Sequence, residues 1–298
     1  MNLLDKLLDI PSVRVSAYRT EEEWLAARQK LITASAVAAI MGKSSFMGRL
    51  QLWYMMRGQI EDGGTKYVDE RAMGHDSEAF HSILHMKYTG RTTEDPGDYC
   101  IVTNEKYPGI GATLDRLQWD DEKGLGVLEM KWLREFRRKN WTPLPESVLY
   151  QVQTQMLVTE LPYASVSVVI GGCKPICTDV EAHKGVQGGI VRAVGAWMRS
   201  LADGAPPEPT GHETDAPTLD AVFGEGDEGA CDSGLDLLDH YNEWERLAAE
   251  RIAISKREDE IKAKVKAYMG PHTKAIGPGY EFNITGENRV LRRKERKQ

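Results

Sequence analysis

Two acidic residues and a lysine are spaced so that they could carry out a hydrolytic reaction. Glu129 and Lys131 lie two positions apart in an apolar stretch, and Asp115 precedes Glu129 by 14 positions. Side chains two apart in a β-strand point to the same face. Carboxylate oxygens are ligands that Mg²⁺ prefers, and an ammonium group beside them can orient a water or steady the charge on a phosphate. The pattern indicates metal-assisted hydrolysis of a phosphodiester.

A hairpin is the element that must bring these three side chains together. Segments 111–117 and 126–132 have the composition of strands, and residues 120–124, Asp-Asp-Glu-Lys-Gly, are typical of a turn. If the hairpin closes at this turn, Asp115 approaches the other two residues at one end of the ribbon. Met130 would point into the core, and its backbone carbonyl is a further candidate metal ligand.

The Glu-x-Lys pattern is not specific by itself. It occurs again at 260–262, in a charged helical run, and at 295–297, in a basic tail. Both of these are best interpreted as solvated charge pairs. Only 129–131 lies in a strand-like apolar run with an acidic strand upstream, so only this occurrence predicts a site.

Four blocks in a fixed order make the chain resemble the lambda exonuclease branch of the PD-(D/E)XK nuclease superfamily, which includes the YqaJ-type viral recombinases. Asp115 with Glu129-Met130-Lys131 matches the superfamily motif. The other three blocks are R-x(3)-I-T-A-S at 28–35, G-x(3)-E at 74–78 and the Q-V-Q segment at 150–156. The resemblance covers about residues 20 to 170. It implies an α/β fold, a nuclease core with a central mixed sheet flanked by helices.

The resemblance also implies roles for the central residues. Asp115 and Glu129 would be metal ligands, Lys131 the catalytic lysine, and Gln151 a residue near the catalytic centre. Gln155 lies one helical turn after Gln151, so their shared face is either a polar surface or a wall of the active site.

Three further residues take their expected roles from the resemblance. Glu78 would help to hold a second metal ion or its water, and its alternative is an exposed helix acid. Arg28 and Ser35 resemble residues that receive the 5′-terminal phosphate of DNA. Thr33 or Ser35 could cap a helix that runs to Gly42, and the planar guanidinium of Arg28 suits phosphate oxygens. The alternative is that Ser35 is only a cap and Arg28 only a surface residue.

The composition is that of a soluble globular protein, with 41% hydrophobic and 28% charged residues. No run of about twenty apolar residues occurs, and no secretory signal is evident, so we expect a cytoplasmic protein without a membrane span. The four cysteines are most simply free thiols, although Cys173 and Cys177 form a C-x(3)-C pair.

Charge and Gly/Pro content divide the chain into three parts. We expect a nuclease domain at 1–203, an acidic flexible linker at 204–234, and a C-terminal region at 235–298 with a long helix, a hairpin and a basic tail. The linker holds eight acidic residues and no Lys or Arg, so the rest of the chain has a net charge of +1 against −7 overall. The acidity therefore does not argue against DNA binding. The basic run at 134–139 could face a DNA backbone or form an ordinary amphipathic connection.

The expected function is a Mg²⁺-dependent 5′→3′ exonuclease, with Mn²⁺ as a substitute, that acts on double-stranded DNA ends. Its product would be a 3′ overhang for recombination by single-strand annealing. The resemblance implies a homo-oligomer, a trimeric ring in many relatives, and a single-strand annealing protein as partner. Two alternatives remain: a structure-specific endonuclease or polarity-altered exonuclease on the same core, and an inactive module that binds DNA or a partner through 235–298.

Overall fold

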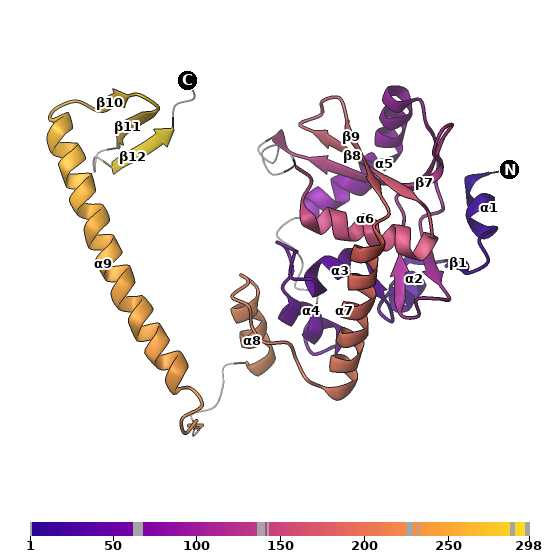
Figure 1. Cartoon of the computed structure of the whole chain (residues 1–298), viewed down its shortest axis with the longest axis horizontal. Coiled ribbons are helices and arrows are strands. Elements are labelled where there is room, and N and C mark those ends of the chain that lie inside the picture. Colours follow the sequence, from indigo (N-terminus) through magenta and orange to yellow (C-terminus); the bar gives the residue numbers. More distant parts are fainter. Residues whose placement is uncertain are drawn as a thin grey trace. The chain divides into compact units, whose positions relative to one another are not determined.

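The chain folds as two compact units, Met1–Gly226 and Asp227–Gln298. The computed structural model, drawn in Figure 1, describes residues 2–61, 68–135, 141, 143–224, 229–231, 233–286 and 290–295.

A five-stranded mixed sheet organises the first unit. Its order is β3-β6-β7-β8-β9, with β7 and β8 parallel and the other neighbours antiparallel. The strands are β3 (Thr92–Glu94), β6 (Arg116–Asp120), β7 (Gly124–Leu133), β8 (Tyr163–Ile170) and β9 (Ile176–Glu181). All eight residues of β8 are buried, because the strand lies inside the sheet and is covered on both faces. The expected α/β nuclease core with a mixed sheet is confirmed.

A smaller sheet of four strands lies in the same unit. Its order is β1-β4-β5-β2, and β2 runs parallel to β5. The strands are β1 (Val13–Ala17), β2 (Ile32–Thr33), β4 (Cys100–Asn104) and β5 (Ile110–Ala112).

The segment predicted as one strand, 111–117, is divided between the two sheets. β5 ends at Ala112 in the small sheet, and β6 begins at Arg116 in the large sheet. The prediction of one continuous strand was therefore wrong. Ala112 and Leu117 are both buried, so apolar character continues along the segment although the chain changes sheets between them. Asp115 lies on this crossover, immediately before β6.

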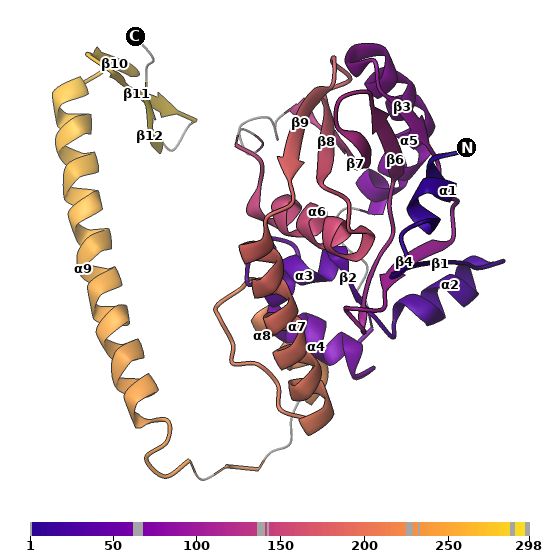
Figure 2. The same cartoon turned by 45° about the vertical axis from the view of Figure 1, so that its right-hand side comes forward.

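Helices α5 (Val68–Thr89) and α6 (Glu146–Thr159) cover the two faces of the large sheet. The first unit also contains α1 (Leu3–Leu8), α2 (Glu21–Arg28), α3 (Ala34–Ile40), α4 (Arg49–Met56) and α7 (Lys184–Asp203). Two glutamines of α6 contact Glu129. On α5, His81 contacts Ser167, which pairs with Met130 in the β7–β8 ladder. Adjacent residues of a strand point to opposite faces, so α5 and α6 lie on opposite sides of the sheet. Figure 2 shows the strands β6 to β9 with α6 and α7.

The region predicted as a flexible linker contains a helix. α8 (Asp215–Phe223) belongs to the first unit, and its first residue, Asp215, is buried. Thr214 accepts the backbone N–H of Gly48 at 3.1 Å, and Asp215 Oδ2 accepts those of Thr210 and His212 at 2.7 and 3.1 Å. Short polar side chains therefore tie this segment to the loop before α4, a role that composition alone did not reveal.

The second unit consists of one long helix and a small sheet. α9 (Leu238–Met269) is followed by β10 (Lys274–Gly277), β11 (Tyr280–Thr285) and β12 (Val290–Glu295), which pair antiparallel in that order. The helix and the β11–β12 hairpin were expected, and β10 extends the hairpin to a three-stranded sheet. Within the described ranges, no helix is long and apolar enough to cross a membrane.

Candidate active site

The end of the β6–β7 hairpin brings Asp115 to Glu129. The ladder runs from Asp120↔Gly124 to Arg116↔Leu128, and β7 continues beyond it. Asp115 comes directly before the last paired residue, and its Oδ2 accepts the backbone N–H of Met130 at 2.7 Å. A side chain thus takes the place of the next ladder bond. The predicted approach of Asp115 to the Glu129 end of the ribbon is what the structure shows.

Alternation along β7 sorts the motif residues by face. Glu129 and Lys131 point the same way, and Lys131 Nζ forms an ion pair with Glu129 Oε1. The side chain of Glu129 is 1% exposed and that of Lys131 is 28% exposed, so the lysine forms the solvent side of the pair. Met130 is buried on the other face, as predicted.

Two glutamines of α6 hold the Glu129 carboxylate from the far side. Gln151 donates its amide to Oε1 at 2.8 Å, and Gln155 donates to Oε2 at 2.6 Å. Gln155 is fully buried and also lies 3.4 Å from the backbone oxygen of Thr113. The shared face of these glutamines is therefore a wall of the candidate site. Gln155 was not among the predicted catalytic residues, although its four-residue spacing from Gln151 was a signal for it.

The carboxylates of this site crowd one another electrostatically. Burial raises the pKa of Asp115 well above its ordinary value, the charge of Glu129 raises it further, and Lys131 and the Met130 N–H oppose the shift. Burial acts to lower the pKa of Lys131, but the charges of Glu129 and Asp115 outweigh it and leave the pKa above its ordinary value. Lys131 is thus an ammonium at neutral pH, and the site favours an additional positive charge.

A cation fits the donor set. Across the described ranges, no three His, Cys, Asp or Glu side chains converge on one point. Asp115 and Glu129 nevertheless offer two neighbouring carboxylates, and Mg²⁺ is typically bound through one or two carboxylates while it keeps several waters. The raised pKa of Asp115 is the second sign of fit, because a bound cation would relieve the repulsion that causes part of it.

Glu78 lies at the rim of the site, on α5. Its Oε2 is 3.4 Å from Arg116 Nη1, and its Oε1 is 3.4 Å from His75 Nδ1. Arg116 also pairs with Asp95 at 3.0 Å and donates to the backbone oxygen of Asp115. The charge of Glu78 contributes to the raised pKa of Asp115. Glu78 is therefore coupled to the centre, while its carboxylate is engaged by a guanidinium and an imidazole.

Arg28 and Ser35 are brought together by α2 and the start of α3. Arg28 Nη2 lies 3.5 Å from Ser35 Oγ, and the guanidinium lies 4.9 Å from the ring centre of Trp24. Thr33 occupies the N-cap position of α3 without a side-chain cap bond, and its hydroxyl lies 3.1 Å from that of Ser35. The predicted capping by Thr33 or Ser35 was wrong, because the two hydroxyls contact each other instead.

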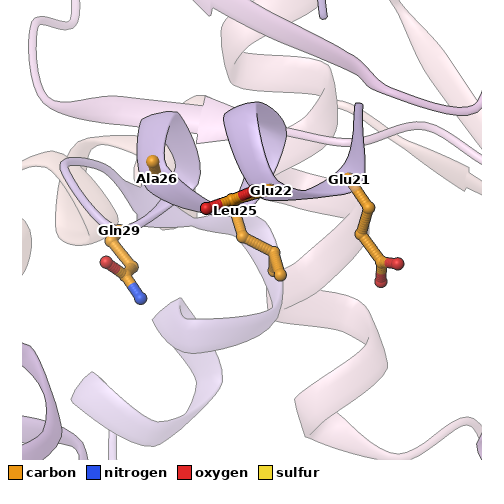
Figure 3. Close-up of a pocket in the computed structure, with 5 residues that line it drawn as sticks. All are labelled: Glu21, Glu22, Leu25, Ala26 and Gln29. Atoms are coloured by element: carbon orange, nitrogen blue, oxygen red, sulfur yellow. The ribbon is translucent and has the colours of Figure 1, made fainter. Parts of the chain in front are cut away.

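A hollow elsewhere in the unit does not contribute to this site. A shallow hollow on α2 is lined by Glu21, Glu22, Leu25, Ala26 and Gln29, which Figure 3 shows to come from a single helix. Its two carboxylates would repel a phosphate, so we assign it no function. Of the predicted basic run, residues 136–139 lie outside the described part of the chain.

The four cysteines are free thiols, as predicted.

The fold and the placement of Asp115 beside Glu129-Met130-Lys131 define a nuclease core of the PD-(D/E)XK type. The family model of the YqaJ-like viral recombinase domain matches residues 23–162. The match covers 140 of the 298 residues, and every candidate site residue lies within it.

One solved structure agrees with the fold. An alkaline exonuclease from Laribacter hongkongensis, LHK-Exo, is 24% identical, with 62% of this chain and 94% of that chain covered and a TM-score of 0.51. LHK-Exo in complex with dAMP gives 22% identity, the same coverage of 62% and 94%, and a TM-score of 0.49. A phage-related exonuclease from Haemophilus somnus gives 13% identity, coverage of 67% and 91%, and a TM-score of 0.40. Among curated proteins, no match to the chain is found.

Proposed function

We propose that this protein is a metal-dependent 5′→3′ exonuclease that degrades one strand of linear double-stranded DNA. The observation that carries the proposal is the meeting of Asp115, Glu129 and Lys131 at the end of β7. Two carboxylates and an ammonium, from the crossover before β6 and from β7, converge there, and the match to the YqaJ-like viral recombinase domain supports nuclease chemistry. The 3′ overhang left by such a reaction would be a substrate for single-strand annealing.

Each protein group has a distinct part in the proposed reaction. Asp115 and Glu129 would hold the cation, and the Met130 backbone carbonyl would be a third ligand. Lys131 orients the attacking water and stabilises the charge that grows on the phosphate. Gln151 and Gln155 donate to the carboxylate of Glu129 and hold it in one orientation, so its remaining lone pairs are available to the cation in a fixed direction. Both donors are neutral, so they hold the carboxylate without cancelling its charge.

The cation we propose is Mg²⁺, with Mn²⁺ as a working substitute. When bound, it would supply Lewis-acid stabilisation of the reacting phosphate. Glu78 is proposed to hold a second cation or its water. The Glu78 carboxylate contacts Arg116 and His75 in this structure. To hold a second cation, it would have to contact the cation and the Arg116 guanidinium at the same time.

Arg28 and Ser35 are proposed to receive the 5′-terminal phosphate. Their side chains already lie 3.5 Å apart, and a guanidinium with a hydroxyl can donate several hydrogen bonds to one phosphate. This placement supports a 5′ end as the starting point of digestion.

Two further expectations concern assembly. We propose a homo-oligomer in the form of a trimeric ring around the DNA, and a single-strand annealing protein as partner. The description of the family as viral recombinases supports a role in recombination. The second unit, Asp227–Gln298, offers surface for such a partner.

Digestion of a linear duplex tests the proposal. The duplex carries a 5′ phosphate and a different label on each strand, and wild type is compared with Lys131→Ala in Mg²⁺. We expect progressive loss from each 5′ end in wild type and at least a hundredfold slower cleavage in the variant, since one positioned proton-transfer or charge-stabilising group contributes about 10²–10⁴ in rate.

Three results would contradict this function. Cleavage of a circular duplex, or equal cleavage when both 5′ ends are blocked, would indicate an endonuclease. Equal rates for wild type and Lys131→Ala would remove the lysine from the mechanism. Absence of cleavage with intact DNA binding would indicate a binding module.

A further inference from the structure

The interface between α5 and the large sheet is polar where a helix would normally bury an apolar stripe. His81 is 1%, His85 0% and Ser82 7% exposed, and all three point at the sheet. Facing them are buried polar side chains of the strands, Gln118, Ser165 and Ser167. Buried polar groups cost free energy unless they are hydrogen-bonded, so their partners must be accounted for.

Each of the three α5 side chains is bonded to a different strand. His81 Nε2 lies 2.9 Å from Ser167 Oγ on β8. Ser82 Oγ lies 2.6 Å from Thr93 Oγ1 on β3. His85 Nε2 lies 3.0 Å from Gln118 Oε1 on β6. The helix is thus fixed at three points spread across the width of the sheet.

The strand partners are themselves held in place. Gln118 donates to the backbone oxygen of Val127 at 2.9 Å and to Ser165 Oγ at 2.7 Å. Ser165 donates to Asp179 at 2.6 Å, and Arg91 binds both oxygens of Asp179 at 2.7 Å. The Gln118 anchor for α5 is therefore held in place by a connected network of buried hydrogen bonds.

Both imidazoles are neutral at neutral pH. Burial lowers the pKa of His81 to about 4, with a further contribution from His85, and burial is also the main cause of the lowered pKa of His85. A neutral imidazole has one N–H donor and one acceptor, so each ring forms a directional bond rather than an ion pair. Directional bonds select one register of the helix, whereas an apolar stripe tolerates a slide along the sheet.

Glu78 lies on the same helix, one turn before His81 and Ser82. Its carboxylate contacts Arg116, which donates to the backbone oxygen of the neighbouring Asp115. The distance from Glu78 to the catalytic carboxylates therefore depends on the position of α5 along the sheet. The contacts at positions 81, 82 and 85 lie next to this point along the helix axis.

We infer that His81, Ser82 and His85 are positioning residues that hold α5 in the register at which Glu78 serves the Asp115/Glu129 centre. This inference rests on the proposed function, because it assigns Glu78 to the cation site. None of the three residues needs to touch DNA or a metal ion.

Variants that separate register from stability provide the test. His81→Phe leaves Ser167 buried without its partner, so it should lower both the thermal midpoint and the affinity for Mn²⁺. In His81→Phe/Ser167→Ala both polar groups are gone, which is often nearly neutral for stability. His81→Gln can return a donor to the place of Nε2. Glu78→Gln is the reference for loss of the Glu78 contribution.

Two readouts are measured on each folded variant: Mn²⁺ binding by calorimetry on DNA-free protein, and the Mg²⁺ concentration for half-maximal cleavage. We expect the double variant to recover the thermal midpoint yet bind Mn²⁺ about tenfold more weakly, like Glu78→Gln, as is common for residues that orient metal ligands. His81→Gln should retain wild-type affinity.

Recovery of both stability and Mn²⁺ affinity in the double variant would overturn the inference, since the interface would then be merely structural. A folded His81→Gln protein that binds as weakly as the double variant would also overturn it. Wild-type Mn²⁺ affinity in Glu78→Gln would also overturn it, because Glu78 would then not serve the cation site, whereas the proposed reaction at Asp115, Glu129 and Lys131 would still stand. If wild type does not cleave DNA but the Mn²⁺ pattern holds, the proposed function fails and the positioning role stands.

Discussion

Gln155 donates its side-chain amide to Oε2 of Glu129 at 2.6 Å, and neither side chain is more than 1% exposed. The bond joins α6 to the middle of β7 and fixes the carboxylate that the proposed cation needs. It also leaves Gln155 Oε1 buried without a hydrogen-bond partner in the described part of the chain. A buried, unpaired acceptor beside a buried carboxylate is a costly arrangement, which is typical of functional sites rather than of structural cores.

Replacing Gln155 should therefore lower the free energy of unfolding more than replacing Gln151. In Gln155→Leu, Glu129 loses a donor in a fully buried place, and we expect the free energy of unfolding to fall by about 1–3 kcal/mol. Gln151 is only half-buried, so Gln151→Leu should cost less because water can replace the lost bond. Urea unfolding of both variants measures the difference, and an equal loss would show that burial does not govern these bonds.

Asp115→Asn should stabilise the metal-free protein while it abolishes cleavage. The pKa of Asp115 is raised in the folded state, so folding favours the protonated form, and the ionised form at neutral pH costs stability. The amide removes that charge and can still accept the Met130 N–H. Thermal unfolding in EDTA at neutral pH should give a higher midpoint for Asp115→Asn than for wild type. The exposed Asp98→Asn is the control, and a lower midpoint for Asp115→Asn would contradict the prediction.

Metal binding should weaken as the pH falls through the raised pKa of Asp115. Protons compete with the cation for this carboxylate, and the competition begins at a higher pH than for an ordinary aspartate. Glu129→Gln removes one cause of the shift, so the acid limb of the Mn²⁺ binding profile should move to lower pH although affinity drops. Calorimetric titrations across the pH range test this, and an unmoved limb would show that burial alone sets the pKa.

Acid should destabilise the first unit through His81. Its pKa is about 4 in the folded state against an ordinary value of 6.5, so the stability it provides is present above 6.5 and is lost as the pH falls towards 4. The loss amounts to roughly 3 kcal/mol for such a shift. Folding free energy measured from pH 7 to pH 4 should be flatter for His81→Gln than for wild type. Parallel curves would refute this assignment.

Removing Arg28 should abolish the preference for a phosphorylated 5′ end. Wild type should digest a 5′-phosphorylated duplex faster than a 5′-hydroxyl duplex, and Arg28→Ala should digest both at the slower rate, roughly a tenfold effect for one lost charge-assisted pair. Arg28→Lys should recover only part of the preference because it lacks the planar fork. Steady-state digestion of the two substrates measures this, and a preference that survives in Arg28→Ala would place the phosphate elsewhere.

Local pattern was sufficient for much of the site. The two-residue spacing of Glu129 and Lys131 predicted their shared face, because side chains in any strand alternate. The four-residue spacing of Gln151 and Gln155 likewise predicted that they share one face of a helix. At the start of α2, Thr20 accepts the N–H of Glu23 at 3.2 Å, a cap that depends only on residues three positions apart.

Other features depended on contacts between distant parts of the chain. No local signal showed that the strand around Asp115 would break and cross between two sheets, since buried apolar residues, Ala112 and Leu117, occur on both sides of the break. The helix α8 in the Gly- and Pro-rich region was missed because its anchor, the bond from Gly48 to Thr214, joins residues 166 positions apart. The hydroxyls of Thr33 and Ser35 were expected to cap a helix and instead face each other.

The sequence by itself determined which residues are candidates for the chemistry and which face of β7 Glu129 and Lys131 occupy, because residue type and strand period are local properties. Only the tertiary structure decided that Asp115 accepts the Met130 N–H from the crossover before β6, that Gln155 holds Glu129, and that His81 and His85 bond α5 to the sheet. These relationships arise from packing, which brings together groups that are far apart along the chain. Packing also excludes water, and this exclusion sets the pKa of Asp115 and of His81.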